Sequence, residues 1–231
     1  MSEIYIHEKS FHVLSETLLA SGGNHNVFEL SLEEPILINL LPYSNILFRK
    51  NKNRNYSESK SLVRIFHELK IRNIPTISFL EKGIYKNEEG VVVENLNNRK
   101  QGQIYVSSNY HPQDKLFLQL KASITQGDYA EPDNSSSKEF YLSHNKLKSI
   151  MNLQEVNKMI KDFITLCTNN KVYFAEDSIF FGVDLQKQTI SDILIGDYDF
   201  VRFDKCNEQE NNNNAMNIAF EEFKMHFVEN A

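Results

Sequence analysis

The stretch ISDILIGDYDFVRFD, residues 190–204, places two acidic residues directly after an apolar run. The apolar residues 193–195, followed by Gly196, predict a short buried strand. A strand of this kind ends where a sheet meets solvent, so Asp197 and Asp199 lie where carboxylates can hold a metal ion. A second interpretation is that both acids only end the strand or cap the next turn. Other segments of the chain are needed to choose between a metal site and a strand end.

Length and charge restrict the class of protein. The chain has 231 residues, enough for one domain or for two lobes, because domains commonly contain about 100 to 200 residues. Its formal net charge is −6, whereas a nucleic-acid binder needs a local surplus of Lys and Arg to neutralise phosphates. The richest basic cluster, FRKNKNR at 48–54, is short and predicts a solvated loop. We therefore expect no nucleic-acid partner.

Hydropathy and cysteine content indicate the compartment. No apolar run approaches the length that spans a bilayer, and no basic segment followed by an apolar leader is present. We expect a soluble protein without a classical signal peptide, either cytoplasmic or exported by a specialised route. Cys167 and Cys206 lie in a helix pattern and a polar tail, so neither a disulfide framework nor a metal cluster is predicted.

The amino-terminal region has the pattern of strands with one helix. Residues 12–31 have apolar stretches on both sides of a glycine-containing turn and predict a hairpin. Two further apolar runs, PILINLL and NILFRK, predict strands joined by a turn at 42–45. A helix is predicted from Ser57, with Leu62, Ile65, Phe66 and Leu69 on one face and Pro75 as its stop. Residues 74–97 then predict two or three strands, the last one ending at Glu94.

From Pro112 onward the pattern is mainly helical. We expect a helix at 112–124, a polar loop around 131–138, and a buried helix within 152–170. The apolar face of the buried helix is formed by Val156, Met159, Ile160, Phe163, Ile164 and Cys167. Two short strands joined by LQKQT follow, and a closing helix carries Met216, Phe220, Phe223 and Phe227. The run ENNNN at 210–214 predicts a disordered loop.

This order of elements resembles the protein kinase-like fold. The resemblance implies an α+β, two-lobed architecture, with residues 1–97 as a β-rich amino-terminal lobe containing one helix. Residues 98–231 would form a short helical carboxy-terminal lobe that carries the strand pair with the metal motif. The chain ends about thirty residues after DYD, which is similar to the minimal kinases that some bacteria inject into host cells.

The resemblance assigns nucleotide-binding roles to several residues. ASGGNHNVF resembles a degenerate glycine-rich loop, with Gly22 and Gly23 in the turn and Val27 over the adenine. ILFR resembles the strand that carries the phosphate-binding lysine, with Arg49 at that position and Lys50 beside it. Glu58 and Glu68 are the acids of the following helix that could pair with this cation, and Glu58 is the better placed of the two. VVVENLN resembles the hinge, where the backbone of Glu94 and Leu96 would meet the adenine.

The metal and catalytic positions match less well. DYD resembles the Asp-Phe-Gly motif and assigns Asp197 as a metal ligand. Aligning DSIFF with the kinase Asn-Ile-Leu strand places Ser178 at the second metal ligand and Tyr173 at the catalytic aspartate. Neither is the residue that the family uses. Asp177 and Glu176 are nearby acids that could take a catalytic or metal role after a shift of register.

Two functions of different class follow. In the first, the protein binds ATP with Mg²⁺ and transfers a phosphoryl group, or alternatively a nucleotidyl group, to a protein or a lipid, since phosphoryl transfer requires mainly positioned charge. In the second, it is a catalytically inactive pseudokinase that acts as a protein-interaction module. Retention of Asp197 and a basic strand residue favours nucleotide binding, whereas loss of the catalytic Asp and metal Asn favours the second function.

Overall fold

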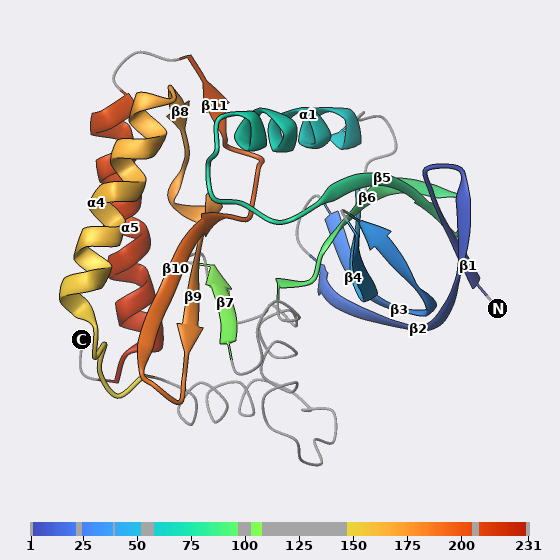
Figure 1. The fold of residues 1–231 in the computed structure, drawn as a ribbon, viewed down its shortest axis with the longest axis horizontal. Helices are drawn as coiled ribbons and strands as arrows, with labels where there is room; N and C mark the ends of the chain where they lie inside the picture. Colours follow the sequence, from blue (N-terminus) through green and yellow to red (C-terminus); the bar gives the residue numbers. More distant parts are fainter. Residues whose placement is uncertain are drawn as a thin grey trace.

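The structure is a computed structural model that describes residues 2–21, 25–38, 40–51, 58–96, 103–107, 147–204 and 208–229. Within these residues the chain is mostly β, with three helices (Figure 1). The elements are β1 (Ser2–Ile6), β2 (Lys9–Ser21), β3 (His25–Ile38), β4 (Leu41–Asn51), α1 (Glu58–Ile71), β5 (Leu80–Tyr85), β6 (Glu88–Glu94), β7 (Gln103–Ser107), α4 (Leu153–Asn169), β8 (Val172–Tyr173), β9 (Ile179–Asp184), β10 (Thr189–Ile195), β11 (Arg202–Phe203) and α5 (Glu208–Phe227).

The amino-terminal strands form a closed barrel in the order β1-β2-β3-β4-β6-β5. β1 closes it, because this strand pairs with β2 on one side and with β5 on the other. The two-lobed kinase-like fold predicted from the sequence is therefore wrong. β1 lies before the first predicted hairpin and was not predicted, although its Ile4 and Ile6 alternate with polar residues and point into the barrel core.

The hairpins of the barrel test the predicted turns. The hairpin at 12–31 is confirmed, since Val13 pairs with Leu32 and Ser21 with Asn26. The predicted turn at 42–45 is wrong, because these residues lie within β4 and Pro42 pairs with Leu37. The chain reverses earlier, next to Leu40, whose φ is 67°.

Helix α1 forms where its apolar periodicity places it. Leu62, Phe66 and Leu69 are buried, and the helix lies along β5 and β6 (Figure 1). It ends at Ile71, before the predicted stop, because Asn73 adopts a φ of 55° and the Ile74 N–H bonds back to the Leu69 carbonyl at 2.9 Å. The chain then runs extended through Pro75 and Thr76 towards the carboxy-terminal part.

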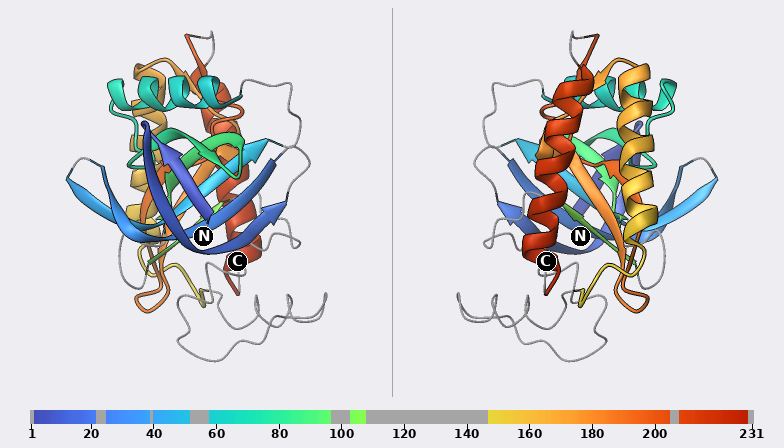
Figure 2. Two further views of the ribbon diagram at one scale, coloured as in Figure 1. Left: turned by 90° about the vertical axis from the view of Figure 1, so that its right-hand side faces the viewer. Right: turned by 90° about the vertical axis from the view of Figure 1, so that its left-hand side faces the viewer.

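The carboxy-terminal part is a three-stranded sheet in the order β10-β9-β7, with α4 and α5 packed side by side against it (Figures 1 and 2). The predicted buried helix is confirmed as α4, and the predicted strand pair as β9 and β10. β7 was not predicted. The predicted helix at 112–124, the polar loop at 131–138 and the lobe boundary at residue 97 lie outside the described residues.

Helix α5 corrects the prediction of a disordered loop at 210–214. These residues form its first turns, and Asn212 is fully buried. The Asn212 amide nitrogen donates to the Val172 carbonyl at 2.8 Å, and its oxygen accepts from the Phe174 N–H at 3.3 Å. An asparagine run therefore supplies one side chain that bonds the backbone around β8.

No helix among the described residues has the length and apolar character needed to cross a membrane.

Candidate functional site

The two acids of DYD lie in a loop that leaves β10 and turns back beside the 3₁₀ turn Glu176–Ser178. The Ser178 carbonyl accepts hydrogen bonds from the backbone N–H of Gly196 at 2.9 Å and of Asp197 at 3.4 Å. Because β9 begins at Ile179 and pairs with β10, the ends of this hairpin bring two acidic segments together. Asp177 and Asp197 thus become neighbours although twenty positions separate them in the sequence.

The segment after α1 fixes this loop from a second side. The Ile195 N–H donates to the Pro75 carbonyl at 3.0 Å, and the Thr76 hydroxyl donates to the Ile195 carbonyl at 2.7 Å. The Thr76 Oγ1 also lies 2.7 Å from the Tyr198 hydroxyl. Tyr198 is buried, and burial raises the pKa of its phenol. The residue between the two acids is therefore an anchor, which leaves Asp197 and Asp199 on the other side of the loop.

Arg49 in β4 joins the barrel to the two acids. Its guanidinium donates to Asp199 Oδ1 and Oδ2 at 3.0 and 2.8 Å, and to Asp197 Oδ1 at 3.3 Å. The Arg49 side chain is 13% exposed, against 35% for Asp197 and 28% for Asp199. Asp197 Oδ1 also accepts from the Asp199 N–H at 3.2 Å. The cation and both carboxylates are thus held in one partly buried network.

Asp177 is a third carboxylate at this place. Burial raises its pKa to about 6, and the negative charges of Asp197, Glu176 and Asp199 add to the shift. Its Oδ1 atom is buried and has no hydrogen-bond partner in the described part of the chain, and the same holds for the hydroxyl of the buried Ser178. Three carboxylates therefore lie at this place, and Arg49 bonds two of them.

The structure brings some of the other predicted residues near Arg49. Val27 lies directly beside Arg49 on the neighbouring strand β3. Lys50 follows Arg49 on the strand, so its side chain points to the opposite face. There it forms an ion pair with Glu88 and lies over the ring of Phe28. Arg49, rather than Lys50, is the cation that faces the acids.

The remaining predicted cofactor residues lie elsewhere or are only partly described. Glu94 is buried at the end of β6, where its carboxylate accepts from the Ser78 N–H at 2.6 Å and the Ser78 hydroxyl at 3.1 Å. Leu96 packs against the core shared by the helices and the second sheet. Glu58 is the first residue of α1, and its side chain is not described. Gly22 and Gly23 lie outside the described residues.

Three residues that shape the site have no role in the kinase resemblance. Asp199 was expected only as a metal-holding carboxylate or as the end of a strand, yet it accepts from Arg49 at 3.0 and 2.8 Å. The spacing of two between Asp197 and Asp199 was the available signal, because extended residues two apart point to the same side. Thr76 and Tyr198 anchor the loop, and nothing in their local sequence indicates a contact across more than one hundred residues.

The donor atoms at the site suit a hard cation. Among the described residues, no three His, Cys, Asp or Glu side chains are grouped closely enough to form a complete metal site. Mg²⁺ does not need such a group, because it retains several waters and binds through one or two carboxylates together with substrate phosphates. The unpartnered oxygens of Asp177 and Ser178, beside Asp197, are donors of the type that Mg²⁺ prefers.

Comparisons with protein-family models, with curated proteins and with solved structures found no match for this chain in any of the three.

Proposed function

We propose that the protein binds ATP with Mg²⁺ at the meeting point of β4, the 3₁₀ turn and the loop after β10, and transfers a phosphoryl group to a protein or a lipid. The observation that carries the proposal is the convergence of Arg49 with Asp177, Asp197 and Asp199. One cation and several carboxylates at one place are the charges that a metal-bound phosphate chain requires.

The charge balance supports a cation as part of the ligand. Asp197 and Asp199 share Arg49, while burial, and then the negative charges of Asp197 and Glu176, raise the pKa of Asp177. A bound Mg²⁺ would offset this repulsion, and Ser178 and Asp197 are the residues that would hold it. The metal would supply charge neutralisation between carboxylates and phosphates, which repel each other without it.

Arg49 would contact the phosphates. A guanidinium binds carboxylate and phosphate oxygens with the same forked geometry, so Arg49 can exchange its aspartate contacts for phosphate oxygens. The carboxylates that it leaves are then available to the metal. Burial of Arg49 between Val27 and Val91 on the adjacent strands holds its stem in place during this exchange.

A proton acceptor for the transfer step is also present. A carboxylate with a pKa near 6 accepts a proton more readily than an ordinary aspartate, because general-base catalysis works best when the pKa lies near the working pH. Asp177 has such a pKa and is partly buried. We therefore assign Asp177 the role of accepting the proton of the acceptor hydroxyl, with Glu176 beside it as a second acid.

A second candidate function is a catalytically inactive protein-interaction module. It is favoured by the bonds of Arg49 to both aspartates, which already pair these charges. In this case the hydrogen bonds of Arg49 to the two aspartates only stabilise the contact between the barrel and the loop after β10. ATP then has no effect on the stability of the protein.

Thermal denaturation with ATP distinguishes the two functions. A ligand at about 100 times its dissociation constant stabilises the folded state by about 2.7 kcal/mol, so ATP with Mg²⁺ should raise Tm by several degrees. Asp197→Asn should lose this shift, whereas Asp162→Asn, an exposed carboxylate on α4, should keep it. An unchanged Tm at millimolar ATP and Mg²⁺ would reject nucleotide binding and leave the interaction module.

A second prediction concerns the pH dependence of stability. Because the pKa of Asp177 is raised in the folded protein to about 6, the folded state retains a proton that the unfolded chain releases near its ordinary value of 3.8. The free energy of unfolding therefore falls as the pH rises through this window. Asp177→Asn removes the effect and should stabilise the protein at neutral pH by about 1 to 2 kcal/mol, allowing for solvent screening of this half-exposed group.

Urea denaturation of both proteins at several pH values checks this prediction. The variant and the wild type should differ little below about pH 3, where the carboxyl is protonated in both states, and should differ most above about pH 6. Mg²⁺ should reduce the difference by stabilising the wild type. A constant difference across the whole range would show that Asp177 does not titrate in this way.

A further inference from the structure

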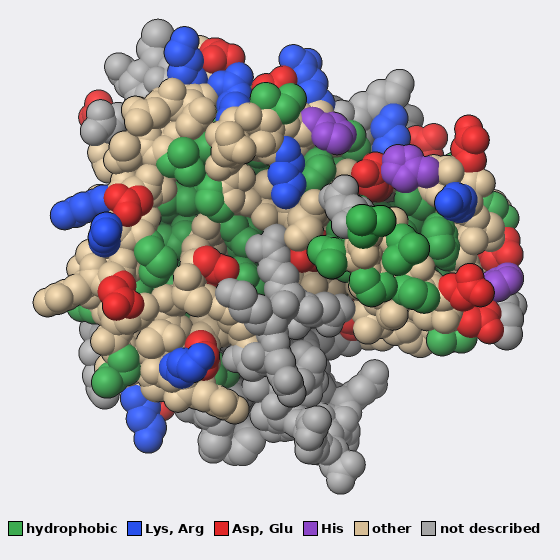
Figure 3. All heavy atoms as spheres, in the orientation of Figure 1, with side chains coloured by type: hydrophobic (Ala, Val, Ile, Leu, Met, Phe, Trp, Pro, Cys, Tyr) green, Lys and Arg blue, Asp and Glu red, His purple; other side chains and the backbone are tan. Residues whose placement is uncertain are grey.

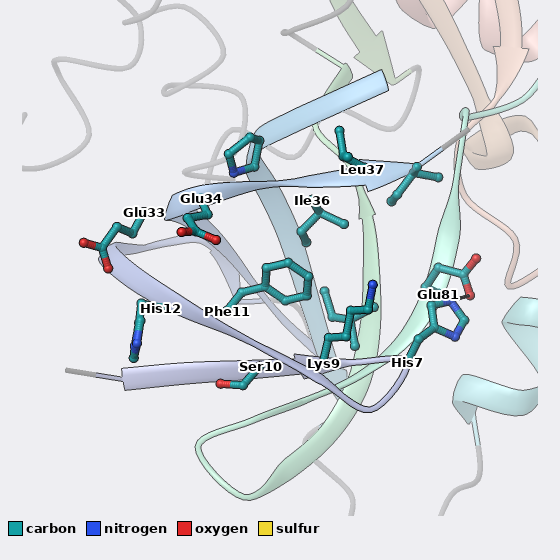
Figure 4. Close-up of a pocket in the computed structure, with 13 residues that line it drawn as sticks. His7, Lys9, Ser10, Phe11, His12, Glu33, Glu34, Ile36, Leu37 and Glu81 are labelled. Atoms are coloured by element: carbon teal, nitrogen blue, oxygen red, sulfur yellow. Dashed lines mark ion pairs between the residues drawn. The ribbon is translucent and has the colours of Figure 1, made fainter. Parts of the chain in front are cut away.

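The barrel has an opening between β2 and β3. The two strands are paired from Ser21 and Asn26 as far as Val13 and Leu32, where their ladder stops. Beyond this point the two strands separate. β2 continues to pair with β1, as far as the pair Ile6 and Lys9, whereas residues 36–38 of β3 pair with β4. A pocket of about 840 Å³ lies between the separated strand ends (Figure 4). It is remote from Arg49 in the strand ladder and is built from other residues.

Among the described residues, no strand pairs with the side of β2 that faces this opening over residues 9–12. His7 and Glu8 have φ values of 48° and 64°, which identifies the β1–β2 turn as a tight two-residue turn. The residues flanking such a turn exchange hydrogen bonds, and hydrogen-bonded pairs alternate along an antiparallel ladder. The pairs Ile6↔Lys9 and Ile4↔Phe11 are then hydrogen-bonded, so the N–H and C=O groups of Ser10 and His12 point away from β1, into the opening.

The β3 side offers fewer backbone donors. Its pairing with β4 is interrupted between Ser31 and Ile36, and Pro35 has no N–H. An added strand would therefore pair with β2, at Ser10 and His12, and use β3 for side-chain contacts. The neighbouring strand in a sheet lies about 4.8 Å away, so the first added strand fits directly against this edge.

The side chains of the pocket define what would fit. Phe11 and the buried Ile36 form an apolar floor, and Leu37 is 70% exposed at the rim (Figure 4). Glu33 and Glu34 are exposed at the end of the pocket that also holds His12. Figure 3 shows apolar side chains gathered on the barrel side of the molecule. The pocket thus combines an apolar strip with the carboxylates of Glu33 and Glu34 at one end, and Lys9 lines its middle.

We propose that this opening binds an extended segment of a partner protein, which adds to β2 as a strand. Main-chain hydrogen bonds to Ser10 and His12 would hold the segment, and alternate side chains would face the floor and the solvent. The complementary segment has apolar residues at every second position, packed on Phe11 and Ile36. Between these apolar residues the partner segment has Lys or Arg, which lie near Glu33 and Glu34. This interaction does not depend on nucleotide binding.

Synthetic nonapeptides provide the probe. We would array peptides with Val, Ile or Phe at alternate positions and Lys or Arg between them, together with versions in which every basic residue is Glu. Fluorescence anisotropy should give micromolar dissociation constants for members of the basic set and weaker binding for their acidic counterparts. The double variant Glu33→Lys and Glu34→Lys should reverse this preference, which a nonspecific apolar contact would not do.

A matched pair of variants tests the strand addition itself. Ser10→Pro removes one N–H of the free edge, whereas Ser10→Ala removes only the side chain. Proline is tolerated here because this N–H does not bond β1. Binding should fall about tenfold or more in Ser10→Pro and stay unchanged in Ser10→Ala, with the same melting curve for both. Asp197→Asn should bind the peptides as the wild type does, which separates this proposal from the nucleotide site.

Three results would overturn the proposal. The first is the absence of binding by any basic peptide at millimolar concentration. The second is equal binding by Ser10→Pro and Ser10→Ala, which would show that the backbone edge is not used. The third is a dimer in sedimentation that Ser10→Pro dissociates, because the occupant would then be a second copy of the chain.

Discussion

Replacing Ile4 by alanine is expected to lower the free energy of unfolding by about 2 to 5 kcal/mol, the usual cost of truncating a fully buried isoleucine. Ile4 is 0% exposed and lies in the strand that closes the barrel, between β2 and β5. The loss has two parts, the removed apolar contacts and the cavity that a packed core cannot fill. Chemical denaturation measures it directly.

Tyr5→Ala is the matched control for this experiment. Tyr5 follows Ile4 on the same strand but is 46% exposed on the outside of the barrel. Its truncation should therefore cost much less than that of Ile4. Equal losses of stability at the two positions would mean that β1 is not packed between β2 and β5. No loss of stability in either variant would mean that this amino-terminal segment lies outside the core.

Replacing Arg49 by methionine is expected to destabilise the protein by about 2 to 4 kcal/mol, since removing the cation of a partly buried ion-pair network leaves its carboxylates without this partner. Methionine retains the apolar stem, so the change mainly removes the guanidinium. Asp197 and Asp199 would then repel each other and Asp177 without a cation between them. The same measurement, urea denaturation near neutral pH, applies.

Lys50→Met is the control, because Lys50 is the next residue and forms an ion pair with Glu88 on the opposite face of β4. This pair is more exposed and should contribute less than about 1 kcal/mol. Adding Asp199→Asn to Arg49→Met should restore part of the lost stability, since it removes one unpaired charge. Strictly additive effects of the two substitutions would contradict a direct interaction between these residues.

Local patterns predicted most of the single elements. The apolar faces of α1, α4 and α5 and the hairpin of β9 and β10 depend on residues close in sequence, and each is present in the structure. Closure of the barrel could not be predicted in this way, because it depends on pairing between β1 and β5, about eighty residues apart. β1 itself is a short strand whose alternation is clear only once its partners are known.

For the candidate site as well, the sequence predicted single residues but not the contacts between distant residues. A strand ending in acids pointed to Asp197, and a basic residue at the end of an apolar strand pointed to Arg49 with Lys50 as an alternative. Only the structure shows that Arg49 faces the acids and that Asp199 takes the shorter contacts. Likewise, the raised pKa of Asp177 arises from burial and from neighbours that the β9–β10 hairpin brings together.

The position of a nucleotide-bound metal ion tests the central claim most directly. Mn²⁺ can replace Mg²⁺, and its unpaired electrons broaden the NMR signals of nearby amides. In a ¹H–¹⁵N spectrum with ATP, Mn²⁺ should first broaden the amides of Asp177, Ser178, Asp197 and Asp199, and Asp197→Asn should abolish this effect. Broadening centred on Glu33 and Glu34, or none that requires ATP, would contradict a metal-nucleotide site beside Arg49.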